Sequence, residues 1–220
     1  MKEHIPLKDG RTLFGRDTNA YQQGRPDYPL PIFALLKEHC GPEICRMAFE
    51  IGPGTGQATE HLLDMGYQVR AIEPDHNLAI KLKERLGRYS QDSFSVINST
   101  FEDAPLEPGC FDLGIAATSF HWIEPVSGLE RIFQLLRPGG WFAMWWTVFG
   151  DPHNVDAFMQ KTEHLFPPLA PVLQTRQVTD TLTHYKKEKG LMIWQKPGLP
   201  SLEVMNIDGN RKWMPRRPDN

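Results

Sequence analysis

The stretch Arg46-Met-Ala-Phe-Glu-Ile-Gly-Pro-Gly-Thr-Gly56 decides the fold. Its first half is a short apolar run that ends abruptly in glycines, as a parallel strand buried on both faces does before a tight turn. Apolar residues then recur at helical spacing from Ala58 to Met65, and a second short run, Tyr67 to Ile72, closes on Glu73. This order predicts a βαβ unit with two parallel strands and a right-handed crossover.

The same alternation continues on both sides of this unit, with glycine and proline marking the turns. Helical spacing begins at Pro31 and stops before Gly41-Pro42, and it recurs at Asn77–Leu86 and Val126–Leu136. Further strands are predicted at Phe94–Ile97, Phe111–Ala117 and, after a break at Arg137–Gly140, Trp141–Phe149. We therefore expect an α/β fold in which a doubly wound, mostly parallel sheet carries helices on both faces.

Three regions differ in character. Residues 1–30 are polar and predict a covering arm, and residues 31–150 hold the α/β domain. Residues 151–220 predict a helical lid after the fifth strand, followed by a possible closing hairpin. Within this last region the expected elements are two helices, two closing strands and a basic, proline-rich tail: Val155–Phe166, Asp180–Lys189, Leu191–Trp194, Leu202–Ile207 and Arg211–Asn220.

Composition narrows the class of protein. The net charge of -3 over 220 residues leaves no basic field that would gather nucleic acid. No run approaches the roughly 20 apolar residues that span a bilayer. The spacing of Cys40, Cys45 and Cys110 fits neither a disulfide framework nor a metal site. We expect a cytoplasmic monomer or homodimer that handles a small-molecule substrate, without metal, membrane or nucleic acid.

The glycine-rich turn indicates a ligand site. In an open α/β sheet, ligands bind outside the carboxyl ends of the strands, and the first strand-to-helix turn supplies the anchoring loop. Glycine at Gly52, Gly54 and Gly56 lets the backbone approach a ligand closely. Glu73 stands 21 residues after Gly52, where a carboxylate accepts the hydroxyls of an adenosine ribose. A purely structural turn is the alternative for the loop alone, but the two features together favour an adenosine ligand.

The spacing of the glycines helps to choose among adenosine cofactors. A dinucleotide fingerprint places its third glycine three residues after the second, whereas here Gly56 follows Gly54 by two and position 57 is Gln. An NAD-dependent oxidoreductase is therefore a disfavoured alternative.

At this point the sequence resembles the class I S-adenosylmethionine-dependent methyltransferases. The resemblance rests on four segments that occur in the family's order: Phe49–Gly56, Ile72–Asp75, Ser99–Asp103 and Leu136–Gly140. Upstream, Tyr21–Pro29 resembles the arm of the branch that includes trans-aconitate methyltransferase-like enzymes, which act on small molecules. The resemblance implies a Rossmann-like methyltransferase fold with S-adenosylmethionine as cofactor.

Carried over to this sequence, the resemblance also assigns cofactor-binding residues. The glycines Gly52, Gly54 and Gly56 border the methionine part, and Glu73 holds the ribose. Thr100, Phe101 and Glu102 flank the adenine. Glu50 orders the loop or the cofactor amine, or it caps nearby N–H groups.

The acceptor is expected at the end of the fourth strand, which reads Ala117-Thr-Ser-Phe-His-Trp122. His121 is a candidate catalytic base for a substrate hydroxyl, with a packed or positioning histidine as the alternative. Tyr21, Arg25, Ser119 and Trp122 are candidate substrate-binding residues. We expect O- or C-methylation of a small molecule, with a carboxylate or a hydroxyl as a candidate acceptor group. The open alternative is a chain that binds S-adenosylmethionine but is inactive or regulatory.

Overall fold

The computed structural model describes residues 11, 14–43, 46–147, 191–195, 203–206 and 211–213. The chain divides into two units, residues 1–146 with 191–220 and residues 147–190. The first unit contains the sheet and its helices. The predicted lid helices at 155–166 and 180–189 lie outside the described residues.

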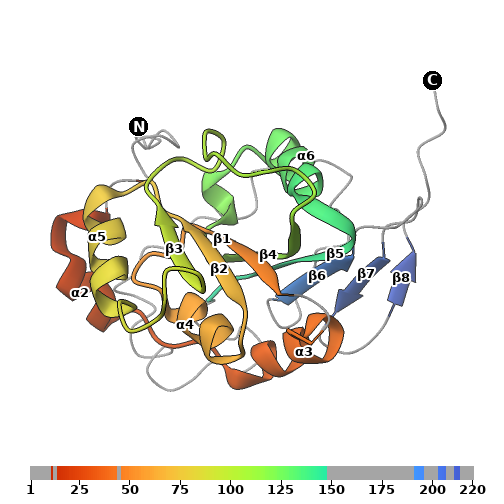
Figure 1. The fold of residues 1–220 in the computed structure, drawn as a ribbon, viewed down its shortest axis with the longest axis horizontal. Coiled ribbons are helices and arrows are strands. Elements are labelled where there is room, and N and C mark those ends of the chain that lie inside the picture. The colour runs from red at the N-terminus through yellow and green to blue at the C-terminus, as the bar shows by residue number, and fades with distance from the viewer. Residues whose placement is uncertain are drawn as a thin grey trace, which may run out of the picture. The chain divides into compact units, whose positions relative to one another are not determined.

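The sheet has the strand order β3-β2-β1-β4-β5-β6-β7-β8 (Figure 1). Its first five strands are parallel and form the doubly wound half: β1 Met47–Ile51, β2 Gln68–Ile72, β3 Phe94–Ile97, β4 Phe111–Ala117 and β5 Leu136–Trp145. The order reverses between β1 and β4, where a ligand site is expected. Three antiparallel strands then extend the β5 edge: β6 Leu191–Gln195, β7 Glu203–Asn206 and β8 Arg211–Trp213. The predicted mostly parallel α/β sheet is confirmed.

Four helices cover the parallel half: α3 Leu30–Cys40, α4 Gln57–Asp64, α5 His76–Arg85 and α6 Pro125–Leu135. Side-chain caps fix the first turns of α5 and α6. The Asp75 carboxylate accepts the N–H groups of Asn77 and Leu78, and Glu124 caps α6 in the same way, so backbone donors that no helical bond satisfies are paired. None of the described helices combines the length and apolar character required to cross a bilayer.

The helices bury opposite faces of the sheet. Side chains of α3, α4 and α5 form one cluster with alternate strand residues such as Val69 and Leu113. Figure 1 shows α3 and α4 on one side of the sheet and α6 on the other. All seven residues of β4 are buried, as expected of a central parallel strand. Leu62 and Leu82 are fully buried, and each contributes about 1.5–3 kcal/mol relative to an exposed side chain.

The structure differs from the sequence-based expectation at three places. The arm contains a 3-10 turn, η1 Phe14–Asp17, and a helix, α2 Thr18–Gly24, started by the Asp17 carboxylate on the N–H of Ala20. The predicted break at residues 137–140 lies inside β5, because Leu136 already pairs with Phe111 before the register shifts. Residues 211–213, predicted as tail, form β8 through backbone pairing with β7, which requires no apolar pattern.

Close packing inside β4 gives a test of the fold. A Cβ added at Gly114 would lie 2.3 Å from the Phe49 ring, so Gly114→Ala forces a buried aromatic to move. We expect a loss of about 1–3 kcal/mol in unfolding free energy, measured by urea denaturation. Gly24→Ala is the matched control, since its added Cβ meets nothing within 4 Å. Equal stability of the two variants would contradict this packing.

Candidate functional site

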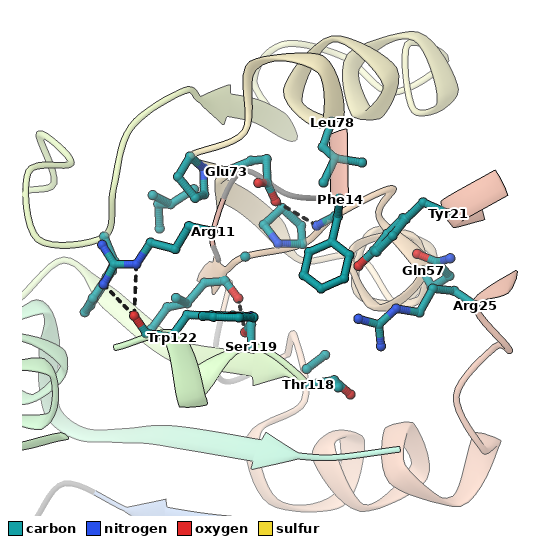
Figure 2. A pocket seen from close by; sticks show the side chains of 18 of the residues that line it. Arg11, Phe14, Tyr21, Arg25, Gln57, Glu73, Leu78, Thr118, Ser119 and Trp122 are labelled. Carbon is teal, nitrogen blue, oxygen red and sulfur yellow. Dashed lines mark hydrogen bonds between the residues drawn. The ribbon is translucent and has the colours of Figure 1, made fainter. Parts of the chain in front are cut away.

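A pocket opens at the carboxyl ends of β1, β2 and β4, beneath the N-terminal arm (Figure 2). The empty space of this pocket, open solvent included, is about 750 Å³. The lining residues come from the arm, from the turns after these strands and from the segments that follow: Arg11, Phe14, Tyr21, Arg25, Pro26, Tyr28, Ile51, Gly52, Pro53, Gly54, Gln57, Ile72, Glu73, Pro74, Leu78, Phe101, Ala117, Thr118, Ser119, Trp122 and Ile123.

The glycine loop forms one wall of the pocket. Gly52 and Gly54 line it with φ of 61° and 60°, values that favour glycine. A Cβ at Gly54 would lie 2.9 Å from the Tyr21 hydroxyl, so only a glycine leaves the arm room to cover the loop. Gly56, the third predicted glycine, does not line the pocket. A Cβ there would lie 2.4 Å from a methyl of Leu82, so Gly56 lets α5 pack against the loop.

The carboxylate of Glu73 faces the pocket and is 97% removed from solvent, with 3% exposure. One of its oxygens accepts the N–H of Gly54 at 2.9 Å, and the other accepts the N–H of Asp75 at 2.9 Å. Burial raises the pKa of Glu73 to about 7, against these two hydrogen bonds, which lower it. Each carboxylate oxygen can accept two hydrogen bonds and here accepts one from the backbone, so each has one acceptor site left for a ligand hydroxyl.

Glu50 lies behind the loop and does not line the pocket. It is buried at 1% exposure, and the Thr59 hydroxyl donates to it at 2.5 Å. Burial raises the pKa of Glu50 to about 8, while the bond from Thr59 lowers it. This geometry matches a carboxylate that ties β1 to α4 rather than one that contacts a ligand.

The residues predicted to flank adenine, Thr100 to Glu102, do not all reach the pocket. Phe101 lines the pocket, and its ring stacks on that of Phe49 with centroids 6.0 Å apart. Thr100 instead bonds the Asp103 carboxylate at 2.7 Å, and the Glu102 carboxylate forms an ion pair with Arg11 at 2.6 Å. Of the three predicted residues, only Phe101 borders the pocket directly.

The four predicted substrate-binding residues all line the pocket. The guanidinium of Arg25 lies 5.0 Å from the centre of the Tyr21 ring, within reach of a cation–π interaction. The Ser119 hydroxyl donates to the carbonyl of Ile51, and the Trp122 ring packs edge-on against Phe14. Figure 2 shows Arg25 reaching across the pocket toward Thr118 at the end of β4.

His121, the predicted catalytic base, is exposed and is not among the lining residues. It belongs to the 3-10 turn η2 Phe120–Trp122, in which successive side chains point in different directions. Trp122 therefore borders the pocket while its neighbour does not, and the rings of His121 and Trp122 lie 4.7 Å apart.

Several lining residues were not predicted as site residues. Tyr28, within the quoted arm, reaches the carbonyl of Ala117 at 3.3 Å, and the arm motif is the signal that could have identified it. Thr118 adopts a positive φ of 57°, unusual for a β-branched residue, and its N–H donates to Trp145. No sequence pattern marks that conformation. Arg11 and Phe14 were not predicted either. They contact Trp122, which is far away in the chain, and such contacts leave no local sequence signal.

Comparison with solved structures identifies the fold. The fold is similar to a type II methyltransferase described as putative from Anaeromyxobacter dehalogenans, with a TM-score of 0.55, 23% identity, and coverage of 82% of this chain and 72% of that one. It is also similar to a phosphoethanolamine N-methyltransferase from Haemonchus contortus, with a TM-score of 0.54, 19% identity, and coverage of 73% and 40%. The fold is therefore the Rossmann-like methyltransferase fold.

Sequence comparison then gives the family. The model of the methyltransferase domain matches residues 49–144. An uncharacterised methyltransferase from a Geobacillus species is 30% identical over 67% of this chain and 70% of its own length. The chain therefore belongs to the methyltransferase domain family. An uncharacterised Mycobacterium tuberculosis methyltransferase is 29% identical over 64% of this chain, and the match spans 54% of that protein, about half its length.

The buried carboxylate of Glu50 predicts a pH dependence of stability. Its folded pKa of about 8 exceeds its ordinary value of 4.5, so the folded protein binds the proton more tightly. The contribution of Glu50 to the free energy of unfolding is then greatest below the ordinary pKa of 4.5 and is lost as the pH rises to about 8. Glu50→Gln, which is neutral at every pH, should flatten the fall of the melting temperature between pH 5 and 8. The exposed Glu38→Gln is the control, and an unchanged slope in Glu50→Gln would contradict the assignment.

Proposed function

We propose that this chain binds S-adenosylmethionine in the pocket and transfers its methyl group to a small-molecule acceptor. The observation that carries the proposal is the hydrogen bond from the N–H of Gly54 to the Glu73 carboxylate, which joins the turns after β1 and β2 beside the point where strand order reverses. A carboxylate with two acceptor sites left lies next to a loop whose glycines at 52 and 54 present bare backbone to the pocket, as an adenosine linked to an amino acid requires.

The residues of the pocket fit this cofactor. Glu73 would accept the ribose hydroxyls through the acceptor site left on each oxygen. Gly52 and Gly54 would border the methionine part, with the N-terminus of α4 beside them to favour its carboxylate. Phe101 and the neighbouring apolar side chains would pack against the adenine.

The acceptor would lie at the end of β4, between Arg25, Tyr28 and Thr118. When bound, the cofactor supplies an electrophilic methyl group, so the protein's task is to hold a nucleophile in line and to exclude water. Burial raises the pKa of Tyr28 to about 12, so its hydroxyl stays a neutral donor. Arg25 makes no ion pair with a carboxylate within the described ranges, and it would bind an anionic acceptor.

No histidine is among the residues lining the described part of the pocket, which bears on the chemistry of the acceptor. A carboxylate is already ionised at neutral pH and needs no base, so it fits this site better than an alcohol does. O-methylation of a carboxylate is the reaction that we favour. Tyr21, Arg25 and Tyr28, from the segment that resembles the trans-aconitate methyltransferase-like arm, all line the pocket and support that branch.

The first test is calorimetric titration with S-adenosylhomocysteine, a compound with which the Haemonchus contortus neighbour was solved. We expect micromolar binding of S-adenosylhomocysteine and no binding of NADH. In Glu73→Ala the affinity for S-adenosylhomocysteine should fall by at least about tenfold, because the ribose hydroxyls lose their hydrogen bonds to a charged carboxylate. Failure of the folded protein to bind S-adenosylhomocysteine would rule out the proposal. Binding without turnover on a panel of carboxylic acids and phenols would favour an inactive or regulatory relative.

The same titration should depend on pH. Hydrogen bonds from a ribose favour the charged form of Glu73, so below its pKa of about 7 binding must also displace a proton. Affinity for S-adenosylhomocysteine should therefore be highest above pH 7 and weaken as pH falls through it. Glu73→Gln should bind more weakly and lose this dependence. The titration covers about 1.5 pH units on either side of this pKa, from about pH 5.5 to about pH 8.5. A wild-type affinity that is constant over this range would contradict the role given to Glu73.

A further inference from the structure

Arg11 is held at the pocket by four hydrogen bonds, two to the Glu102 carboxylate and two to the carbonyl of Trp122. Its two terminal nitrogens donate to the two carboxylate oxygens of Glu102 at 3.0 and 2.6 Å, and its Nε donates to the carbonyl of Trp122 at 2.9 Å. The side chain of Arg11 is 14% exposed and that of Glu102 is 35% exposed. A bidentate pair of this kind fixes the plane of the guanidinium as well as its position.

These bonds join segments that are far apart in the sequence. Arg11 and Glu102 are separated by 91 positions, and Arg11 and Trp122 by 111. Through Arg11, the arm, the loop after β3 and the turn after β4 meet at one end of the pocket. Phe101 and Ile123, the chain neighbours of Glu102 and Trp122, also line the pocket and are buried and apolar.

Figure 2 shows which end this is. Arg11 and the Trp122 carbonyl lie on one side of Glu73, whereas Tyr21, Gln57 and Arg25 lie on the other side. A nucleoside whose ribose is bound at Glu73 extends its base in one direction and its 5′ substituent in the other. Because the glycine loop and Gln57 mark the end for the amino-acid part, the Arg11 end is left for the base.

We propose, on the basis of the function proposed above, that Arg11 closes the adenine end of the pocket and binds the cofactor there. The planar guanidinium supplies a face on which an aromatic base packs. Glu102 is then a positioning residue, which acts on the cofactor through Arg11. This assignment differs from the sequence-based one, in which Glu102 flanks the adenine itself.

The test compares two ligands that share the adenosine part. S-Adenosylhomocysteine and 5′-methylthioadenosine are titrated into the full chain and into Arg11→Met. We expect both compounds to bind about tenfold more weakly, because the lost contact lies at the end that they share. Gln57→Ala, at the other end, should weaken S-adenosylhomocysteine more than methylthioadenosine. Arg16→Met, exposed on the same arm, should leave both affinities unchanged.

A double-mutant cycle tests whether Glu102 acts on ligand affinity through Arg11. Glu102→Gln should weaken both ligands by a smaller factor, Arg11→Lys should retain part of the affinity, and Arg11→Met with Glu102→Gln should be no worse than Arg11→Met. Melting temperatures confirm that each variant is folded at the titration temperature.

Unchanged or tighter binding by a folded Arg11→Met would overturn this inference alone, and tighter binding would mean that Arg11 obstructs the adenine end. Additive losses in the double variant would overturn the positioning role of Glu102. A wild-type chain that binds neither compound would overturn the proposed function and this inference with it.

Discussion

The carboxylate of Glu73 joins the two turns from which the pocket is built. It accepts one N–H from the glycine loop after β1 and one from the turn after β2, so a single side chain fixes the distance between them. Parallel pairing of β1 with β2 makes this possible, because it brings both carboxyl ends to the same edge of the sheet. Burying an acid in this way is costly, and the raised pKa of Glu73 records that cost.

Residues of the N-terminal arm are bonded to the helices and strands that surround the pocket. Gly15 donates its N–H to Asp75 and accepts from Asn77, so η1 rests on the first turn of α5. Further along, Asp27 contacts His61 on α4 at 3.0 Å, and Tyr28 reaches the end of β4. The parallel half of the sheet thus supplies the floor of the pocket, and residues of the arm supply one wall. Because Gly15 and Tyr28 of the arm are bonded to the segments that follow β2 and β4, next to the proposed cofactor and acceptor sites, cofactor binding and the position of these arm residues are expected to be coupled.

Features that depend on a short local sequence pattern could be predicted from the sequence. The five parallel strands, the glycine loop and the position of Glu73 follow from apolar runs and turn residues that are read within a short window. The pair Arg11–Glu102 has no such signal, since nothing local distinguishes it from two solvated charges. The placement of His121 outside the pocket depends on a single 3-10 turn, and the positive φ of Thr118 depends on its bond to Trp145. Helix α2 lacks the apolar periodicity by which helices are recognised, and its N-cap at Asp17 was the remaining cue.

In the proposed complex, Glu73 holds the ribose of an adenosine-containing cofactor, and the glycine loop borders its amino-acid end. A crystal structure of the full chain with S-adenosylhomocysteine tests this arrangement most directly. We expect ribose hydroxyls within hydrogen-bond distance of the Glu73 carboxylate, the homocysteine part along Gly52 and Gly54, and the adenine on the side of Arg11 and Phe101. A ligand bound with its ribose away from Glu73, or in a different cleft, would contradict it.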